Sequence, residues 1–217
     1  MLPEQSSLKQ FSSEYLAVLR GELAGLNLTR ILNEEDFFYK QIYDSVIPLS
    51  KSEVFNNSIL KTKRVVDIGF GGGFPILPLA YCLPEVSFIG FEARRKKSDA
   101  VNLIAKRLGL KNVKTFHKRI EDINLDIESV ITFKAVGEVS KYLKMMNFIC
   151  TSKVFFYKGP EFETKESLKD LKHFEIIENI DFEVPCTDGR KLIGFQNVPR
   201  RTNSINNKDL VNLSQFF

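Results

Sequence analysis

The chain has 217 residues, of which 43% are hydrophobic and 27% are charged, and its formal net charge at pH 7 is +4. This length suits one well-buried domain with an additional element, and the composition excludes a disordered, collagen-like or fibrous protein. No apolar run approaches the roughly 20 residues that span a bilayer, and the first residues lack the basic-then-apolar pattern of a signal peptide. We therefore expect a globular cytoplasmic protein that does not bind a membrane.

Cysteines and histidines are too few and too scattered for a metal centre. The three cysteines, Cys82, Cys150 and Cys186, are widely spaced and odd in number, which argues against a disulfide framework and a zinc cluster. Neither His117 nor His173 has a partner at metal-ligand spacing. The sequence therefore predicts no metal site.

The first 60 residues have the periodicity of helices. Between residues 8 and 26, apolar side chains recur at helical spacing: Leu8, Phe11, Tyr15, Leu19 and Leu26. A second helix is predicted from Asn33, a suitable N-cap followed by three acidic residues, toward Pro48. We interpret residues 1–60 as an N-terminal helical cap.

From residue 64 onward, short β-rich runs alternate with helical segments. The strand-like runs cover residues 64–70, 86–92, 113–118, 129–136 and 153–159, and the helical segments cover 74–82, 95–108, 138–147 and 163–172. Alternation of this kind predicts a parallel sheet with crossover helices. The fold class is therefore α/β, with one Rossmann-like domain over residues 61–200.

Two further strand-like runs follow near the C-terminus. Residues 174–184 and 191–198 flank the turn signal Asp188–Gly189, so we expect an antiparallel hairpin at the edge of the sheet. Residues 201–217 are polar and Asn-rich until their end. They form a C-terminal tail that is either frayed or docked through Leu210, Leu213 and Phe216.

The most informative segment is the glycine-rich run after the first strand. It reads Asp-x-Gly-x-Gly-x-Gly, formed by Asp67, Gly69, Gly71 and Gly73, and then opens a helix at Phe74. Glycine reaches positive φ without penalty and lets a ligand lie against the main chain. The spacing fits neither a dinucleotide fingerprint nor a Walker loop. It resembles the cofactor loop of class I S-adenosylmethionine (SAM)-dependent methyltransferases.

Acidic residues follow the next two strands. Glu92 ends the run 86–92, where a carboxylate can accept hydrogen bonds from both ribose hydroxyls of an adenosine. Ile120 and Glu121 follow the third strand, where such folds place groups beside the adenine ring. We therefore predict that these three residues bind SAM together with the glycine loop.

Several segments together resemble the bacterial 16S ribosomal RNA (guanine-N7)-methyltransferase G family, also called glucose-inhibited division protein B. They are DIGFGGGFPILPLA, FEARRKKSDAV, RLGLKNVKTFHKRIED and ITFKAV, preceded by an NLT motif at residues 27–29 and a DS pair at residues 44–45, and followed by KG at residues 158–159. The resemblance covers most of residues 25–200. It implies that Gly69 and Phe74 contact SAM, that Ile120 and Glu121 flank its adenine, and that Lys134 faces the methyl-donor cleft.

Three positions depart from the family pattern. Lys134 stands where the family usually has arginine, and lysine lacks the planar bidentate fork. Gln41 replaces a histidine ahead of the DS pair, and Phe70 replaces a serine or threonine within the glycine loop.

The resemblance implies methylation of guanine N7 in the decoding-centre loop of 16S ribosomal RNA. Guanine N7 carries an in-plane lone pair and no proton, so the reaction needs placement rather than a general base. We expect Lys134 to act as the positioning group of the reaction, and the partner to be 16S rRNA or a small ribosomal subunit particle. We also expect a monomer.

Positive charge is concentrated where an RNA substrate needs it. Residues 61–119 hold thirteen Lys or Arg against four Asp or Glu. The residues we expect to bind RNA phosphates are Arg94, Arg95, Lys96, Lys97, Lys158, Arg200 and Arg201. Two alternatives remain open: an enzyme that methylates a small molecule or a protein, and a non-catalytic RNA-binding assembly factor on the same fold.

Overall fold

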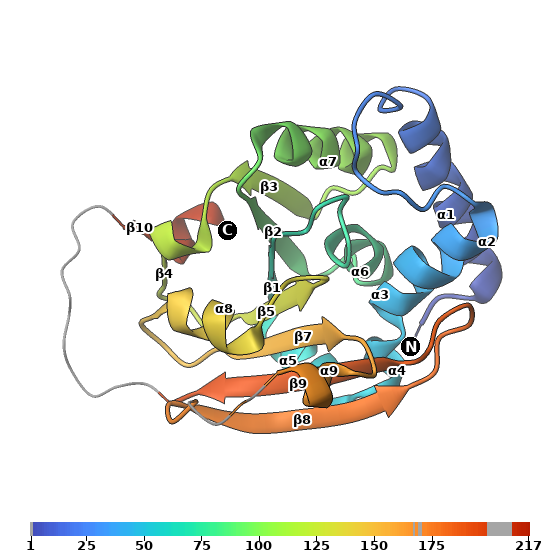
Figure 1. Cartoon of the computed structure of the whole chain (residues 1–217). Helices are drawn as coiled ribbons and strands as arrows, with labels where there is room; N and C mark the ends of the chain where they lie inside the picture. The colour runs from blue at the N-terminus through green and yellow to red at the C-terminus, as the bar shows by residue number, and fades with distance from the viewer. Residues whose placement is uncertain (1, 167, 169–170, 199–209) are drawn as a thin grey trace.

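The core of the protein is a seven-stranded sheet in the order β3-β2-β1-β5-β7-β9-β8 (Figure 1). The computed structural model describes residues 2–166, 168, 171–198 and 210–217. The strands are β1 Arg64–Ile68, β2 Ser87–Glu92, β3 Val113–His117, β5 Val130–Lys134, β7 Lys153–Lys158, β8 Phe174–Phe182 and β9 Arg190–Asn197. The first five of this order pair in parallel, and β9 pairs antiparallel with both β7 and β8. The predicted Rossmann-like α/β fold and edge hairpin are confirmed.

Helices connect the parallel strands close to the predicted positions. They are α6 Ile76–Cys82, α7 Arg95–Arg107 and α8 Val139–Met145. The helix expected over residues 163–172 is wrong in extent, because α9 covers only Phe162–Lys165 and Glu166 adopts an extended conformation. The Glu166 carboxylate instead accepts hydrogen bonds from the Val139 amide at 2.7 Å and the Lys158 ammonium at 2.6 Å. Helix α9 therefore ends before Glu166, whose side chain bonds to the start of α8 and the end of β7.

The N-terminal 60 residues are helical, but in more pieces than the periodicity predicts. Helix α1 covers Gln5–Arg20, and α2 (Glu34–Phe37) begins at the predicted cap Asn33, whose side chain accepts hydrogen bonds from two backbone amides of the first turn. The chain then continues as a π-helical turn, η1, followed by three short helices. The bounds are η1 Phe38–Tyr43, α3 Asp44–Val46, α4 Pro48–Lys51 and α5 Glu53–Thr62.

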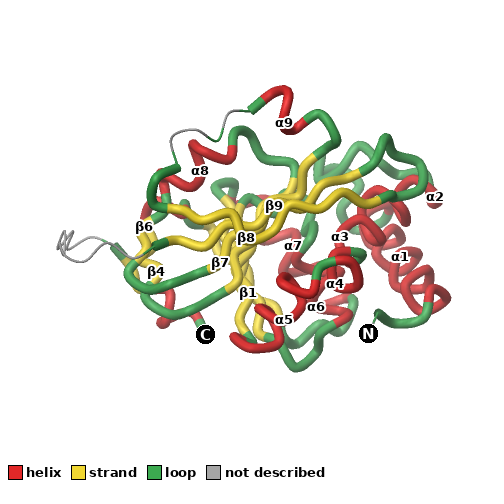
Figure 2. Tube along the Cα trace, turned by 90° about the horizontal axis from the view of Figure 1, so that it is seen from below, coloured by secondary structure: helices red, strands yellow, loops and turns green. Residues whose placement is uncertain are grey.

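Each face of the sheet carries its own hydrophobic cluster. Val65 of β1 packs in the cluster shared with α1, α6 and α7, whereas its neighbour Val66 packs in the cluster beneath α8. This alternation follows from the two-residue period of a strand. Figure 2 shows α8 and α9 on one side of the strands and α1, α4 and α6 on the other. The N-terminal helices therefore share one core with the sheet.

A second, three-stranded sheet holds the end of the chain. It joins β4 (Ile123–Leu125) to β6 (Asn147–Phe148) and β10 (Val211–Asn212). Leu213 is fully buried, and the Phe216 ring packs edge-on against Phe91 at 5.1 Å. The described end of the chain is therefore docked. None of the described helices is long and apolar enough to cross a membrane.

Candidate functional site

A cavity of about 580 Å³ opens where β1, β2, β3 and β5 end. We call it the larger cavity. Its volume lies in the usual range for small-molecule sites. Of the cofactor-binding residues predicted from the sequence, those on its wall are Gly69, Gly71, Phe74, Glu92, Ile120, Glu121 and Lys134. Four separate segments of the chain thus meet at one site.

The glycine loop exposes its backbone to this cavity. Gly69 and Gly71 have φ values of +68° and +56°, which L side chains rarely adopt. A β-carbon at Gly71 would have no protein atom closer than 4.0 Å. The free space in front of Gly71 is therefore available to a ligand.

Glu92 ties the second strand to the glycine loop. The residue is 8% exposed, and its carboxylate accepts hydrogen bonds from the Gly71 amide at 3.2 Å and the Arg94 amide at 3.0 Å. A carboxylate has about four acceptor positions. Two remain for donors in the cavity, as the predicted binding of ribose hydroxyls requires.

Two predicted cofactor-binding residues do not reach the cavity wall. Asp67 is fully buried, and its carboxylate accepts hydrogen bonds from Thr132 Oγ1 at 2.9 Å and the Ile76 amide at 3.1 Å. At Gly73, a β-carbon would lie 2.5 Å from the Tyr15 hydroxyl oxygen. Contact with the cofactor stays a prediction for both residues, and the structure gives them other contacts: Asp67 anchors the start of α6, and Gly73 makes room for α1.

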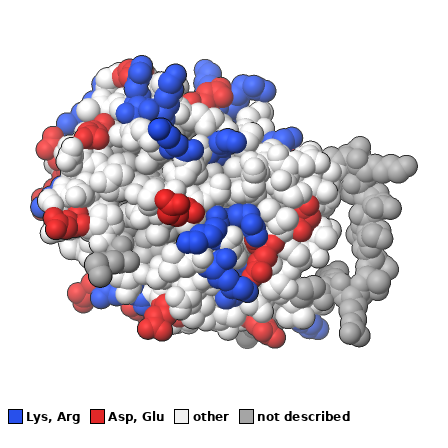
Figure 3. All heavy atoms as spheres, turned by 180° about the vertical axis from the view of Figure 1, so that it is seen from behind, with Lys and Arg blue, Asp and Glu red and all other residues white. Residues whose placement is uncertain are grey.

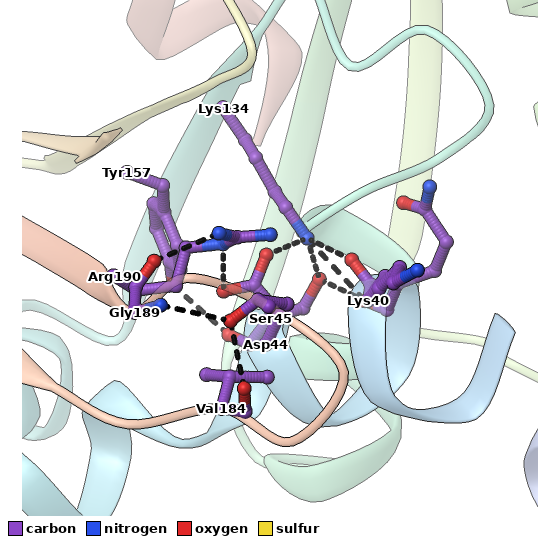
Figure 4. A network of polar contacts seen from close by, with 10 residues as sticks. Lys40, Asp44, Ser45, Lys134, Tyr157, Val184, Gly189 and Arg190 are labelled. Atoms are coloured by element: carbon purple, nitrogen blue, oxygen red, sulfur yellow. Dashed lines mark hydrogen bonds and ion pairs between the residues drawn. The ribbon is translucent and has the colours of Figure 1, made fainter. Parts of the chain in front are cut away.

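The Lys134 side chain lines the cavity, but its ammonium turns toward the helical cap (Figure 4). The Nζ atom lies 2.8 Å from Asp44 Oδ2, 3.2 Å from Ser45 Oγ and 3.3 Å from the Lys40 carbonyl oxygen. An ammonium has three donors. Protein acceptors occupy all three, so Lys134 joins the end of β5 to the segment that includes η1 and α3.

Asp44 lies between two cations. Its other oxygen, Oδ1, lies 3.3 Å from Arg190 Nε at the start of β9 (Figure 4). Burial lowers the pKa of the Lys134 ammonium, and the charge of Asp44 opposes that shift. The sequence motif identifies Asp44, but Arg190 was missed because nothing local links it to a residue 146 positions earlier.

The residues predicted to bind RNA fall into three groups. Arg94 and Lys97 line the larger cavity, and with Arg95 and Lys96 they also line a neighbouring space of about 380 Å³, the smaller cavity. Lys158 is not free to bind phosphate, because its ammonium bonds to Glu166 and to the Gly137 carbonyl, both at 2.6 Å. Its expected role in RNA binding stays a prediction, and these two bonds argue against it. Arg200 and Arg201 lie outside the described residues.

Other wall residues were not predicted from the sequence to bind a ligand. Leu28 and Thr29 belong to the NLT motif, and Ala135, with φ +55°, begins the loop after β5. A non-glycine residue at positive φ often marks a functional site, but the sequence does not reveal it. Tyr142 and Met145 on α8 also line the cavity and share the spacing of ordinary core residues.

The residues present fit SAM. The backbone at Gly69 and Gly71 carries no side chain, so a ligand can lie against it. Glu92 has acceptor positions left for the ribose hydroxyls, and Ile120 gives an apolar surface beside Glu121. Among the described residues, no group of three or more His, Cys, Asp or Glu could hold a metal ion.

Solved structures with the same fold include SAM-dependent enzymes. A SAM-dependent O-methyltransferase from Thermotoga maritima has a TM-score of 0.50 and 18% identity, and the match covers 85% of this chain and 73% of that one. The structure of MtNAS in complex with MTA and tNA gives a TM-score of 0.52 at 14% identity, covering 89% and 71%. At these identities the likeness concerns the fold alone.

Sequence comparisons are more specific. The "Ribosomal RNA small subunit methyltransferase G" of Solibacter usitatus is 30% identical over 201 residues, covering 88% of this chain and 91% of the relative. The protein of the same name from Streptococcus pyogenes is 29% identical over 196 residues, covering 85% and 81%. The family model described as GidB, rRNA small subunit methyltransferase G, matches residues 8–193. The chain belongs to the rRNA small subunit methyltransferase G family.

Proposed function

We propose that the chain transfers the methyl group of SAM to N7 of a guanine in the decoding-centre loop of 16S rRNA. One observation carries the proposal: in a chain of this family, the bare glycine loop, the Glu92 carboxylate and the residues after β3 line one cavity. We further propose that the protein acts in the cytoplasm as a monomer, on a small ribosomal subunit particle or its RNA.

Each wall residue has a binding role in this proposal. Glu92 accepts hydrogen bonds from the ribose hydroxyls, while Ile120 and Glu121 flank the adenine. Gly69 and Gly71 let the cofactor lie against the main chain. The Phe74 ring stacks on Tyr15, with ring centroids 5.2 Å apart, and forms the part of the cavity wall between the glycine loop and the helical cap.

The reaction does not require a general acid or a general base. SAM supplies a methyl group on a positively charged sulfur, and guanine N7 has no proton to lose. The protein therefore acts through placement. Since positive charge moves onto the guanine, a free cation beside it would oppose the reaction. Asp44 and Lys134 form an ion pair at 2.8 Å, which limits that opposition.

The test compares ribosomal RNA from cells with and without the gene by mass spectrometry. We expect one 7-methylguanosine to disappear from 16S rRNA and to return when purified protein and SAM are added to small subunits from the deficient cells. An unchanged nucleoside profile would contradict the proposal. Absence of SAM binding by calorimetry would favour the assembly factor, and methylation only of small molecules or proteins would favour the other alternative.

A further inference from the structure

The larger cavity has a nucleoside half and a second half on the far side of β1. Glu92 ends β2 and Ile120 follows β3, and both strands lie on one side of β1 in the sheet. Lys134 ends β5, which lies on the other side of β1. If the adenosine occupies the first half, the methyl acceptor must approach the second.

Gln41 lines the cavity on that second side. Its backbone carbonyl oxygen accepts a hydrogen bond from Ser45 Oγ at 2.5 Å and lies 3.5 Å from the Lys134 ammonium, so the residue sits beside the end of β5. Gln41 also belongs to the π-helical turn η1. Single π-helical turns occur frequently at functional sites.

The Gln41 side chain is available for a ligand. Among the described residues, its carboxamide has no hydrogen-bond partner, and it is the one carboxamide on the wall of the larger cavity. Its backbone is fixed while its side chain is free, as a group that binds substrate requires.

The chemistry of the acceptor matches this group. When guanine N7 points at a methyl donor, the polar atoms left for recognition are the O6 acceptor, the N1–H donor and the N2 amino group. A carboxamide donates from Nε2 and accepts at Oε1 in one plane. It can therefore pair with O6 and N1–H together.

We propose that Gln41 binds the target guanine through these two hydrogen bonds and so holds N7 toward the methyl group. This assignment rests on the proposed function. Since Gln41→Ala removes two net hydrogen bonds to the substrate, it should lower kcat/KM for RNA by about thirtyfold. Its affinity for SAM should stay within about twofold of wild type, because the carboxamide lies outside the nucleoside half.

The deciding experiment is a double-mutant cycle that combines one change in the enzyme with one change in the target base. Small subunits are reconstituted with 16S rRNA that carries either guanosine or 2-aminopurine riboside at the target position; the latter keeps N7 but lacks O6 and N1–H. Wild type should methylate the 2-aminopurine subunits more slowly than the guanosine subunits. Gln41→Ala should methylate both kinds of subunit at similar rates. Gln196→Ala, which removes a carboxamide of similar exposure from β9, serves as the control and should behave as wild type.

Two results would overturn the assignment. One is additive loss, in which Gln41→Ala and 2-aminopurine each keep their full effect when combined. The other is a parallel fall in SAM affinity and rate, which would assign Gln41 a structural role. If wild type fails to methylate the guanosine-containing subunits, the proposed function itself is wrong, so the two failures are distinguishable.

Discussion

Gly71 combines a backbone conformation that favours glycine with free space for a ligand in front of it. Its φ of +56° strains any L residue, and the space in front of it is empty. Alanine in this conformation costs about 1 to 2 kcal/mol, and its methyl group would project toward the cofactor. We predict that Gly71→Ala lowers SAM affinity by at least about tenfold in calorimetry.

Gly109 provides the matched control for that variant. It has a φ of +69° and open space around it, but it follows α7 away from both cavities. Gly109→Ala should therefore lower the free energy of unfolding by a similar amount and leave SAM affinity unchanged. Equal losses of affinity in the two variants would mean that strain alone, rather than the loop's contact with the cofactor, explains the effect.

Asp67 gives the protein a pH-dependent stability. Burial raises the pKa of its carboxyl group from 3.8 to about 7, although hydrogen bonds from Thr132 and Ile76 oppose the shift. Between pH 4 and pH 7 the folded protein thus keeps a proton that the unfolded chain has released. The free energy of unfolding therefore falls as pH rises through this range.

Asp67→Asn should remove this dependence. Urea denaturation between pH 4.5 and 8 should show the variant gaining stability relative to wild type as pH rises, by up to about 3 kcal/mol at roughly 1.4 kcal/mol per pKa unit. Asp99→Asn, at an exposed position on α7, should follow wild type throughout. A constant difference between Asp67→Asn and wild type at every pH would contradict the assignment.

At the scale of elements, helix α1 supports the glycine loop. The buried Tyr15 hydroxyl donates a hydrogen bond to the Gly72 carbonyl oxygen, and the ring packs on Phe74. We predict that Tyr15→Phe lowers the free energy of unfolding by about 1 kcal/mol and weakens SAM binding several-fold, because the loop loses its anchor.

Tyr81→Phe is the matched comparison for this variant. Tyr81 also donates a hydrogen bond to a backbone carbonyl oxygen, that of Ser7, but this bond joins α6 to α1 and does not involve the glycine loop. We expect this variant to bind SAM as wild type does. If both variants weaken SAM binding equally, α1 stabilises the whole fold rather than the loop.

Local patterns explain which elements could be predicted from the sequence. The glycine loop, the parallel strands and the cap at Asn33 each depend on residues a few positions apart. The partners of Lys134 could not be predicted, since Ser45 and Lys40 lie 89 and 94 positions earlier. The π-helical turn η1 was missed as well, because its apolar spacing reads as an ordinary helix.

Over the whole molecule, Lys and Arg side chains gather in groups, and one group, at the start of α7, lines both cavities. Figure 3 shows one group of Lys and Arg side chains along the top edge of the molecule, the edge on which α7 lies in Figure 1, and a second group lower on the same face. Helix α7 has no acidic residue in its first turn, so Arg95, Lys96 and Lys97 oppose the helix dipole there. That arrangement costs local stability, which is consistent with a role in binding phosphate.

Charge reversal at these positions should separate RNA binding from cofactor binding. We predict that replacing Arg94, Arg95, Lys96 and Lys97 with Glu weakens binding to small subunits strongly. The slope of log affinity against log salt should also fall, by about 0.7 to 0.9 for each phosphate that the protein no longer neutralises. Calorimetry should show a much smaller change for SAM, because Glu92 receives its hydrogen bond from the Arg94 backbone rather than its side chain. Reversal of four exposed lysines that line neither cavity, Lys63, Lys106, Lys111 and Lys114, changes the net charge by the same amount and serves as the control. Equal losses from both sets of reversals would mean that overall charge, and not the placement of the α7 cluster, governs binding.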